Sequence, residues 1–274
     1  MTTRTTTTSA FAWRPDEKFF AANEVVDDAL IMKTATKAGV VDGDMPVVRV
    51  AYLDDTDADY YDEASEIDET DPDLAEITVS TRKLAQLVRV SSEQYRLEET
   101  AEQLSGSVAR ALIRKADADY ITGTDPVGLA NIAGTVEAGS LGTDLDALVD
   151  LIATIESNGG KPSHIVVDPL AWASIRKIKW DTTDSNASLL GAGTLDVQKM
   201  LLGLPVIVNR FVGAHSGVVL DKEAVVSAIG PVSVAVSEHA GFSSDTVVLR
   251  AIWRIGWNIV RPNWVGSFDT EPGT

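Results

Sequence analysis

Apolar residues along the chain alternate in some segments and recur every three or four positions in others, so the sequence predicts an α+β protein. Residues 45–53 read MPVVRVAYL, a strand that is rich in β-branched residues and has Pro46 at its start, where a missing N–H costs least. Alternation returns over residues 74–90. We therefore expect a long hairpin over 45–90, with residues 54–73 at its tip.

A long helix is predicted next. Ser91 and Gln94 have the spacing of a capping box, and Gly123 is expected to end the helix. Apolar residues recur on one face at Leu97, Ala101, Leu104, Val108, Leu112, Ala116 and Tyr120. About 30 residues would span roughly 45 Å, and Gly106 is a candidate bend.

Residues 144–180 have an α-β-α pattern. A helix capped by Thr143 or Asp144 precedes a buried strand at 164–167, and Asp168 followed by Pro169 then has the N-cap and first-turn order of a second helix. Another strand is expected over 204–212. From residue 217 onward short strands are predicted at 217–221, 224–229 and 231–239.

The last predicted strand is unusually long. Seven apolar residues alternate strictly: Val247, Leu249, Ala251, Trp253, Ile255, Trp257 and Ile259. The opposite face carries Arg250, Arg254 and Asn258. Thirteen residues make a strand of roughly 40 Å. One apolar face of that length needs a cover, and we expect the hairpin and the long helix to provide it.

Negative charge is concentrated at the tip of the predicted hairpin. The chain of 274 residues has a net charge of −18, and eleven acidic residues lie between 54 and 73 without a single Lys or Arg. Such density favours an extended, solvated loop. The net charge also argues against broad wrapping of nucleic acid. No run of 18 apolar residues occurs, and the Thr-rich start lacks the apolar core of a signal peptide, so we expect a protein made in the cytoplasm with a flexible arm over 1–20.

Candidate chemistry is sparse. Asp55, Asp57, Asp59 and Glu66 fall at positions 1, 3, 5 and 12 of a calcium loop, although Tyr60 occupies the place of the usual Gly and the flanks are strands. A calcium-dependent binding module that uses this loop therefore stays an alternative to a solvated loop. The chain has no cysteine, its three histidines (164, 215 and 239) are far apart, and no nucleophile elbow or phosphate loop is present. We expect no enzyme activity and no cofactor.

The order of these elements resembles the major capsid proteins of tailed double-stranded-DNA bacteriophages, which have the Hong Kong 97 fold. Three segments are similar to that family: 161–169 (KPSHIVVDP), 202–208 (LGLPVIV) and 242–260. The resemblance implies an N-terminal arm (1–44), an extended acidic hairpin loop (45–78), a peripheral domain with the spine helix and long strands (79–124 and 241–268) and an axial domain (125–240).

The resemblance also implies a function. Copies would self-assemble as a homo-oligomer into hexamers and pentamers of an icosahedral shell that encloses the genome in the virion, after assembly in the host cytoplasm. Expected partners are a separate scaffolding protein, a portal and a minor capsid or decoration protein, with no membrane and no sequence-specific DNA binding. An encapsulin-type nanocompartment shell of the same fold is the alternative. No Lys lies between Lys37 and Lys83, so the covalent crosslink that some members form through this loop is not expected.

We expect the acidic loop to lie across a neighbouring subunit and to contact its cations. The candidate inter-subunit residues are Asp54, Asp55, Asp57, Asp59, Asp62, Glu63 and Glu66 on the loop, Arg96, Arg110 and Arg114 on the long helix, and Arg250 and Arg254 on the long strand.

Overall fold

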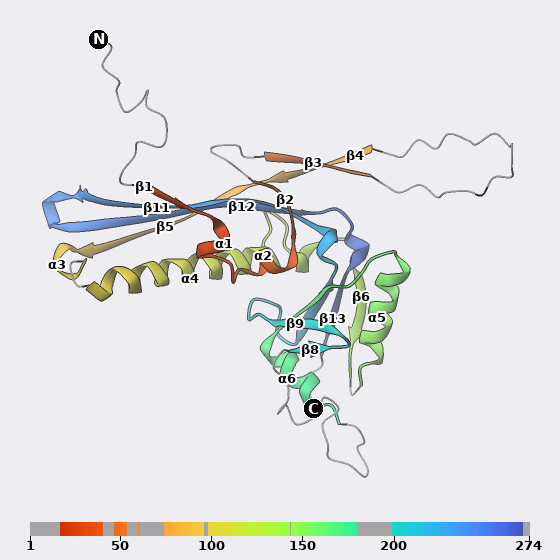
Figure 1. Cartoon of the computed structure of the whole chain (residues 1–274). Helices are drawn as coiled ribbons and strands as arrows, with labels where there is room; N and C mark the ends of the chain where they lie inside the picture. Colours follow the sequence, from red (N-terminus) through yellow and green to blue (C-terminus); the bar gives the residue numbers. More distant parts are fainter. Residues whose placement is uncertain are drawn as a thin grey trace.

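The computed structural model describes residues 17–40, 47–53, 60, 74–95, 98–142, 144–179 and 199–270. These residues form an elongated body, a compact body at one end of it and a hairpin that reaches away from both (Figure 1). The predicted mixture of helices and strands is confirmed.

The elongated body is built on a five-stranded sheet in the order β1-β11-β12-β5, with β2 also paired to β11. The strands are β1 (Glu17–Phe20), β2 (Thr36–Val40), β5 (Arg82–Ser91), β11 (Val225–Gly241) and β12 (Thr246–Ile259). Helix α4 (Glu98–Thr122) runs along one face of this sheet (Figure 1).

The predicted long strand is β12, and its alternation has the expected consequence. All seven apolar residues are at most 8 % exposed, and six of them, from Leu249 to Ile259, belong to the main core with Leu112, Ala116 and Tyr120 of α4. The ring of Tyr120 meets that of Trp257 edge-on at 5.4 Å between centroids. The prediction that the long helix covers this strand is confirmed.

The expectation of two short strands over 224–239 is wrong, because β11 is one strand of 17 residues. Ile229 pairs with Ile255, and Val232 pairs with Trp253, so β11 has one more residue here than β12. This bulge lies at Gly230 and Pro231, where Gly230 supplies a carbonyl that accepts a hydrogen bond from Trp253 Nε1 (3.2 Å). Proline is tolerated in a sheet at such a bulge because it has no N–H to leave unpaired.

The capping box is confirmed in part, since the Gln94 N–H donates to Ser91 Oγ (3.3 Å). It begins the helix α3 (Ser92–Tyr95), and α4 is described from Glu98 on, with residues 96–97 outside the described part of the chain. Helix α4 passes through Gly106 without interruption and ends at Thr122. Gly123 closes it as predicted, with its N–H on Asp119 O (2.8 Å).

The compact body contains a mixed six-stranded sheet in the order β6-β13-β10-β7-β9-β8. Its elements are β6 (Val136–Ser140), α5 (Asp146–Ser157), β7 (His164–Val167), α6 (Pro169–Lys177), β8 (Met200–Leu201), β9 (Leu204–Val208), β10 (Ser216–Leu220) and β13 (Val265–Asp269). The α-β-α prediction is confirmed down to the cap, because Asp168 Oδ2 accepts the Leu170 N–H (3.0 Å) and Pro169 begins α6.

Both faces of this sheet are buried. Ile165, Val167, Val219 and Phe268 pack in a core with Leu148 and Leu151 of α5 and Ala171 and Ile175 of α6. The alternate residues Val166, Val218, Leu220 and Val265 belong instead to the main core of the elongated body. One sheet therefore joins the two bodies.

The hairpin is shorter than predicted. Its strands are β3 (Val47–Leu53) and β4 (Leu74–Ser80), which pair from Val47 with Ser80 to Leu53 with Leu74. Residues 82–91, expected to continue the hairpin, pair with β12 instead as strand β5. The chain therefore crosses from hairpin to sheet at Thr81.

Residues 17–40 run along the outer edge of β11. Strand β1 pairs with it at residues 232–235 and β2 at 226–229, and helices α1 (Ala22–Val25) and α2 (Leu30–Thr34) lie between them in sequence. Val26, Leu30 and Ile31 are at most 1 % exposed. The flexible arm expected over 1–20 is wrong for 17–20, while residues 1–16 lie outside the described part of the chain.

Candidate assembly interface

The face of the long sheet opposite α4 is positively charged along β5 and β12. Residues directly opposite in an antiparallel pair share a face; here Arg250 lies opposite Leu87, Arg254 opposite Lys83 and Val248 opposite Arg89. On this face the two strands carry Lys83, Arg89, Arg250 and Arg254, and neither strand has an acid. A cationic face in a chain of net charge −18 suits an acidic partner.

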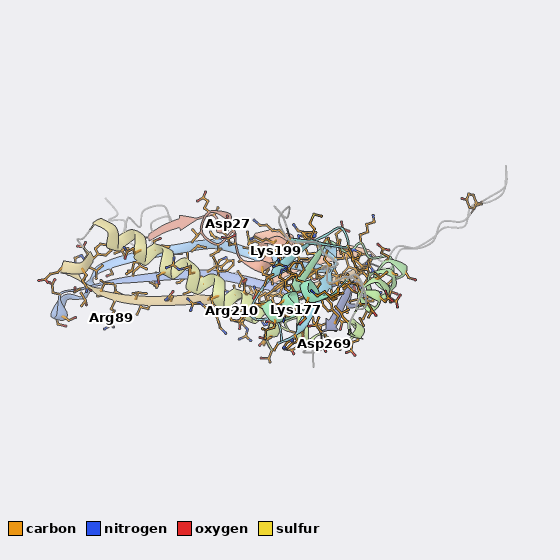
Figure 2. The ribbon with its side chains drawn as sticks, turned by 90° about the horizontal axis from the view of Figure 1, so that it is seen from below. Asp27, Arg89, Lys177, Lys199, Arg210 and Asp269 are labelled. Atoms are coloured by element: carbon orange, nitrogen blue, oxygen red, sulfur yellow. The ribbon has the colours of Figure 1, made fainter. Side chains whose placement is uncertain are left out.

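Lys83, Arg89 and Leu87 were missing from the predicted contact residues. All three are exposed, with Leu87 at 58 %. Alternation with Leu84, Gln86 and Val88 could have placed them on one strand face, but only the pairing of β5 with β12 joins them to Arg250 and Arg254. Arg89 lies toward the end of the sheet that is far from Lys177 and Lys199 of the compact body (Figure 2).

The predicted helix cations lie on the other side of the sheet. Arg110 and Arg114 are exposed on α4, and Lys115 Nζ is bonded to Asp119 Oδ1 (2.6 Å). Arg96 lies outside the described residues. The structure therefore separates the predicted cations into two groups on opposite sides of the sheet, and one extended segment cannot lie flat on both.

The hairpin stem is held by its base. Val79 is completely buried against Val226 and Ala228 on the face opposite α4. Asn258 Nδ2 donates to Thr78 O (3.0 Å), and a Cβ at Gly256 would lie 2.3 Å from Ser80 O. The main chain of the stem thus crosses β12 in direct contact, which only glycine permits.

The predicted acidic contact residues at the tip lie outside the described part of the chain, and so does the candidate calcium loop that includes four of them. They are Asp54, Asp55, Asp57, Asp59, Asp62, Glu63 and Glu66. Tyr60, the described residue between them, is fully exposed. Within the described ranges no three His, Asp or Glu side chains come together as a metal site.

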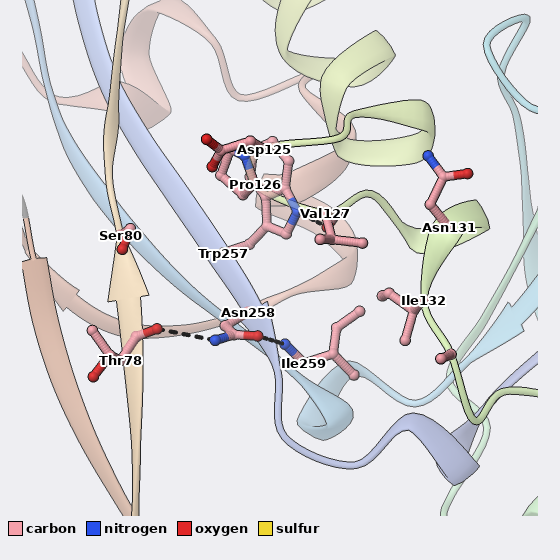
Figure 3. A pocket seen from close by; sticks show the side chains of 11 residues that line it. Thr78, Ser80, Asp125, Pro126, Val127, Asn131, Ile132, Trp257, Asn258 and Ile259 are labelled. Atoms are coloured by element: carbon pink, nitrogen blue, oxygen red, sulfur yellow. Dashed lines mark hydrogen bonds between the residues drawn. The ribbon is translucent and has the colours of Figure 1, made fainter.

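A cavity of about 510 Å³ lies where the hairpin base meets the turn after α4 (Figure 3). Trp257, Ile132 and Val127 line it together with Thr78 and Asn258, and Asp125 is its one titratable residue. The Asp125 carboxylate forms an ion pair with Arg82. Among the described residues that line the cavity, Asp125 therefore has no second titratable group with which to carry out acid–base catalysis.

His164 has the structural environment that its place in a buried strand suggests. Its Nδ1 lies 3.0 Å from Ser163 Oγ. Burial lowers the pKa of His164, and the nearby Lys222 charge adds to this effect.

Among the described helices none is both long enough and apolar enough to cross a bilayer.

Comparisons with known proteins agree with this fold. The sequence profile of the Phage capsid family matches residues 25–265. Similar solved structures include those titled Mycobacterium phage Bobi (14 % identity, TM-score 0.69, covering 89 % of this chain and 91 % of that one) and Gordonia phage Cozz (17 %, 0.69, 89 % and 87 %). A third, the capsid of a native GTA particle, is 16 % identical with a TM-score of 0.66 over 88 % and 90 % of the chains.

The search of curated proteins found no match. The profile match covers most of the chain, and the solved structures share its fold over 89 % of its length. The chain therefore belongs to the phage capsid family and is a capsid shell protein.

Proposed function

We propose that this chain is the major capsid protein of a tailed phage, and that its copies assemble into hexamers and pentamers of an icosahedral shell around double-stranded DNA. The observation that carries the proposal is the hairpin of β3 and β4, whose base packs against the body and whose strands then lead away from it. A hairpin that extends this far from its own body is placed to contact a neighbouring copy of the chain. Repeated heterologous contacts of this kind close into rings and shells.

The strand pairing suggests a division that differs from the predicted ranges. We assign the five-stranded sheet and α4 to the peripheral domain, and the six-stranded sheet with α5 and α6 to the axial domain. Residues 225–240 then move to the peripheral domain because β11 pairs with β12. Residues 265–268 move to the axial domain, because β13 pairs with β10 and β6, and Asp269 joins them there.

The acidic segment 54–73 of one copy is proposed to dock on the outer sheet face of its neighbour, at Lys83, Arg89, Arg250 and Arg254. Charge complementarity supports this face, since β5 and β12 carry no acid. Exposed ion pairs are worth about 0–1 kcal/mol each, so the contact gains strength from repetition over many copies. The opposite side, with Arg110 and Arg114, is the competing location for the same segment.

Other parts of the proposal rest on the family alone. A scaffolding protein, a portal and a minor capsid or decoration protein would be the partners, and assembly would take place in the host cytoplasm before DNA is enclosed in the virion. With a net charge of −18 the shell would confine the genome instead of binding it tightly.

Negative-stain electron microscopy of the purified protein tests assembly, and two matched variants test the docking face. K83E/R89E and R110E/R114E each change the charge by four units, one on each side of the sheet. We expect the first to lower the yield of closed particles strongly and the second to leave it near wild type. Raising the salt concentration should weaken wild-type assembly by screening.

Equal effects of the two variants would contradict the proposed docking face. A wild-type protein that stays monomeric at every concentration, salt level and pH tried would contradict the shell function itself. Closed particles that never contain DNA when isolated from cells, but contain a folded protein cargo, would favour the nanocompartment alternative.

A further inference from the structure

Asp117 is a carboxylate at the junction of three parts of the molecule. It lies in the last two turns of α4 and is 8 % exposed. Its Oδ1 accepts a hydrogen bond from the Leu30 N–H (2.8 Å), and its Oδ2 accepts one from Asn209 Nδ2 (2.8 Å). Leu30 begins α2 of the N-terminal segment and Asn209 follows β9 of the compact body. One side chain thus connects both to α4.

Each of these bonds fills a requirement that the local sequence does not meet. The residue before α2 is Ala29, which has no side-chain acceptor for the free N–H groups of the helix start, so Asp117 supplies one from another helix. Asn209 is held in one orientation, because its Oδ1 accepts the Phe211 N–H (3.0 Å). Its Nδ2 must therefore point at Asp117.

The charged and titratable groups around Asp117 are few. Lys33 of α2 exerts an attractive charge, and its Nζ is bonded to the exposed Asp28 (2.9 Å). On α4, burial raises the pKa of Tyr120 far above its usual value, and its hydroxyl is 3.1 Å from Thr34 Oγ1. Beyond Asn209, the Arg210 guanidinium lies over the Phe211 ring at 5.0 Å.

We propose that Asp117 is a proton-operated latch, which ties the compact body to α4 while it is ionised and releases Asn209 when it takes up a proton. Both carboxylate oxygens face N–H donors, and a neutral carboxyl has one O–H that cannot be directed at a donor. Leu30 donates from the main chain and cannot turn away. Asn209 donates from a side chain whose reversal would cost the Phe211 bond, so the Oδ2 to Asn209 contact is the one that separates.

Protonation loosens this contact without unfolding the protein. Burial raises the pKa of Asp117 above 3.8, and the two hydrogen bonds and Lys33 oppose this only in part. A raised pKa in the fold means that the stability gained by protonation is fully present below pH 3.8 and is lost as the pH rises through the raised value. Acidification thus favours the fold at this residue while it frees Asn209.

Hydrogen exchange of the full chain, measured by mass spectrometry at several pH values and corrected for the intrinsic rate, tests the latch. In the wild type, protection of residues 205–215 should fall on acidification, with exchange on the order of tenfold faster, while α5 keeps its protection. D117N, a neutral variant of the same shape, should show the fast exchange at every pH. D119N removes another acid of the same helix, whose side chain is 36 % exposed, and should behave as wild type.

A double variant separates the latch from a general loss of packing. In D117N/N209D the amide at 117 can donate to the carboxylate at 209, which still offers an oxygen to Phe211. Protection of 205–215 should then return at neutral pH. Failure of this rescue, or a wild-type profile that does not change with pH, would overturn the proposal.

If D117N does not fold, Asn209→Ala provides the same test with the carboxylate retained. Its exchange over 205–215 should be fast and independent of pH. Wild-type protection that still falls with acid in Asn209→Ala would show that Asp117 does not act through Asn209.

Discussion

At Gly256 the main chain of the hairpin passes β12 so closely that a single methyl group would collide with it. A Cβ there would lie 2.3 Å from Ser80 O and 2.9 Å from Thr81 Cα, both of which are backbone atoms that cannot turn aside. Gly106 in α4 is different, because a Cβ would meet only the end of the Arg110 side chain at 3.2 Å. The two glycines therefore have different reasons to be present.

Gly256→Ala should lower the free energy of unfolding by about 1–3 kcal/mol, since the hairpin base must shift to make room. Gly106→Ala is the matched control and should raise it by about 0.5–1 kcal/mol through helix propensity. Urea denaturation of the unassembled protein measures both. A Gly256→Ala protein as stable as wild type would contradict the close passage.

The stability of the fold should depend on pH through His164. Burial and then the Lys222 charge lower its pKa in the fold, so the unfolded chain binds a proton more readily. Stability at this residue is present above pH 6.5 and is lost as the pH falls from there toward the lowered pKa. His164→Gln should remove this part of the slope, whereas His239→Gln, at an exposed residue, should keep it. Denaturation curves measured between pH 5 and 8 give the slope of the free energy of unfolding against pH. Equal slopes in the two variants would refute this role of His164.

At the scale of elements, the bulge in β11 decides which residues of the strand face the main core. Val225 and Ile229 face that core before the bulge, and Val232, Val234 and Val236 face it afterwards, so the positions that face it change from odd to even numbers. The sequence shows both patterns but reads as two strands separated by Gly230 and Pro231. Only pairing with the continuous β12 makes them one strand.

Deleting Pro231 should place Val232, Val234 and Val236 on the outer face, because a shift of one residue reverses every side chain. We expect the variant to be largely insoluble. Pro231→Ala keeps the residue count and should stay soluble with a wild-type circular dichroism spectrum. A deletion variant that folds with the wild-type spectrum and stability would show that the bulge does not set the register.

At the scale of the whole molecule, the two bodies share a core across the six-stranded sheet. Val218 faces the elongated body and Val219 faces α5 and α6, although they are neighbours on one strand. The elongated shape in Figure 1 therefore does not imply independent folding units.

We expect one cooperative thermal transition for the unassembled protein, with calorimetric and van't Hoff enthalpies in agreement. Val218→Ala and Val219→Ala should each lower the free energy of unfolding by about 2 kcal/mol. Each should shift the single thermal transition to a lower temperature without splitting it. Two separate peaks, with each variant moving only one of them, would contradict the shared core.

The sequence by itself determined the long alternating strand, the long helix, the Asp168 cap and the charge imbalance, because each depends on periodicity or on neighbours in the chain. Only the tertiary structure decided where residues 82–91 pair, that 225–241 is one strand, and that the cations lie on two sides of a sheet. These depend on partners far away in sequence. The role of Asp117 could not be predicted from the helical pattern either, because its partners Leu30 and Asn209 are far from it in sequence.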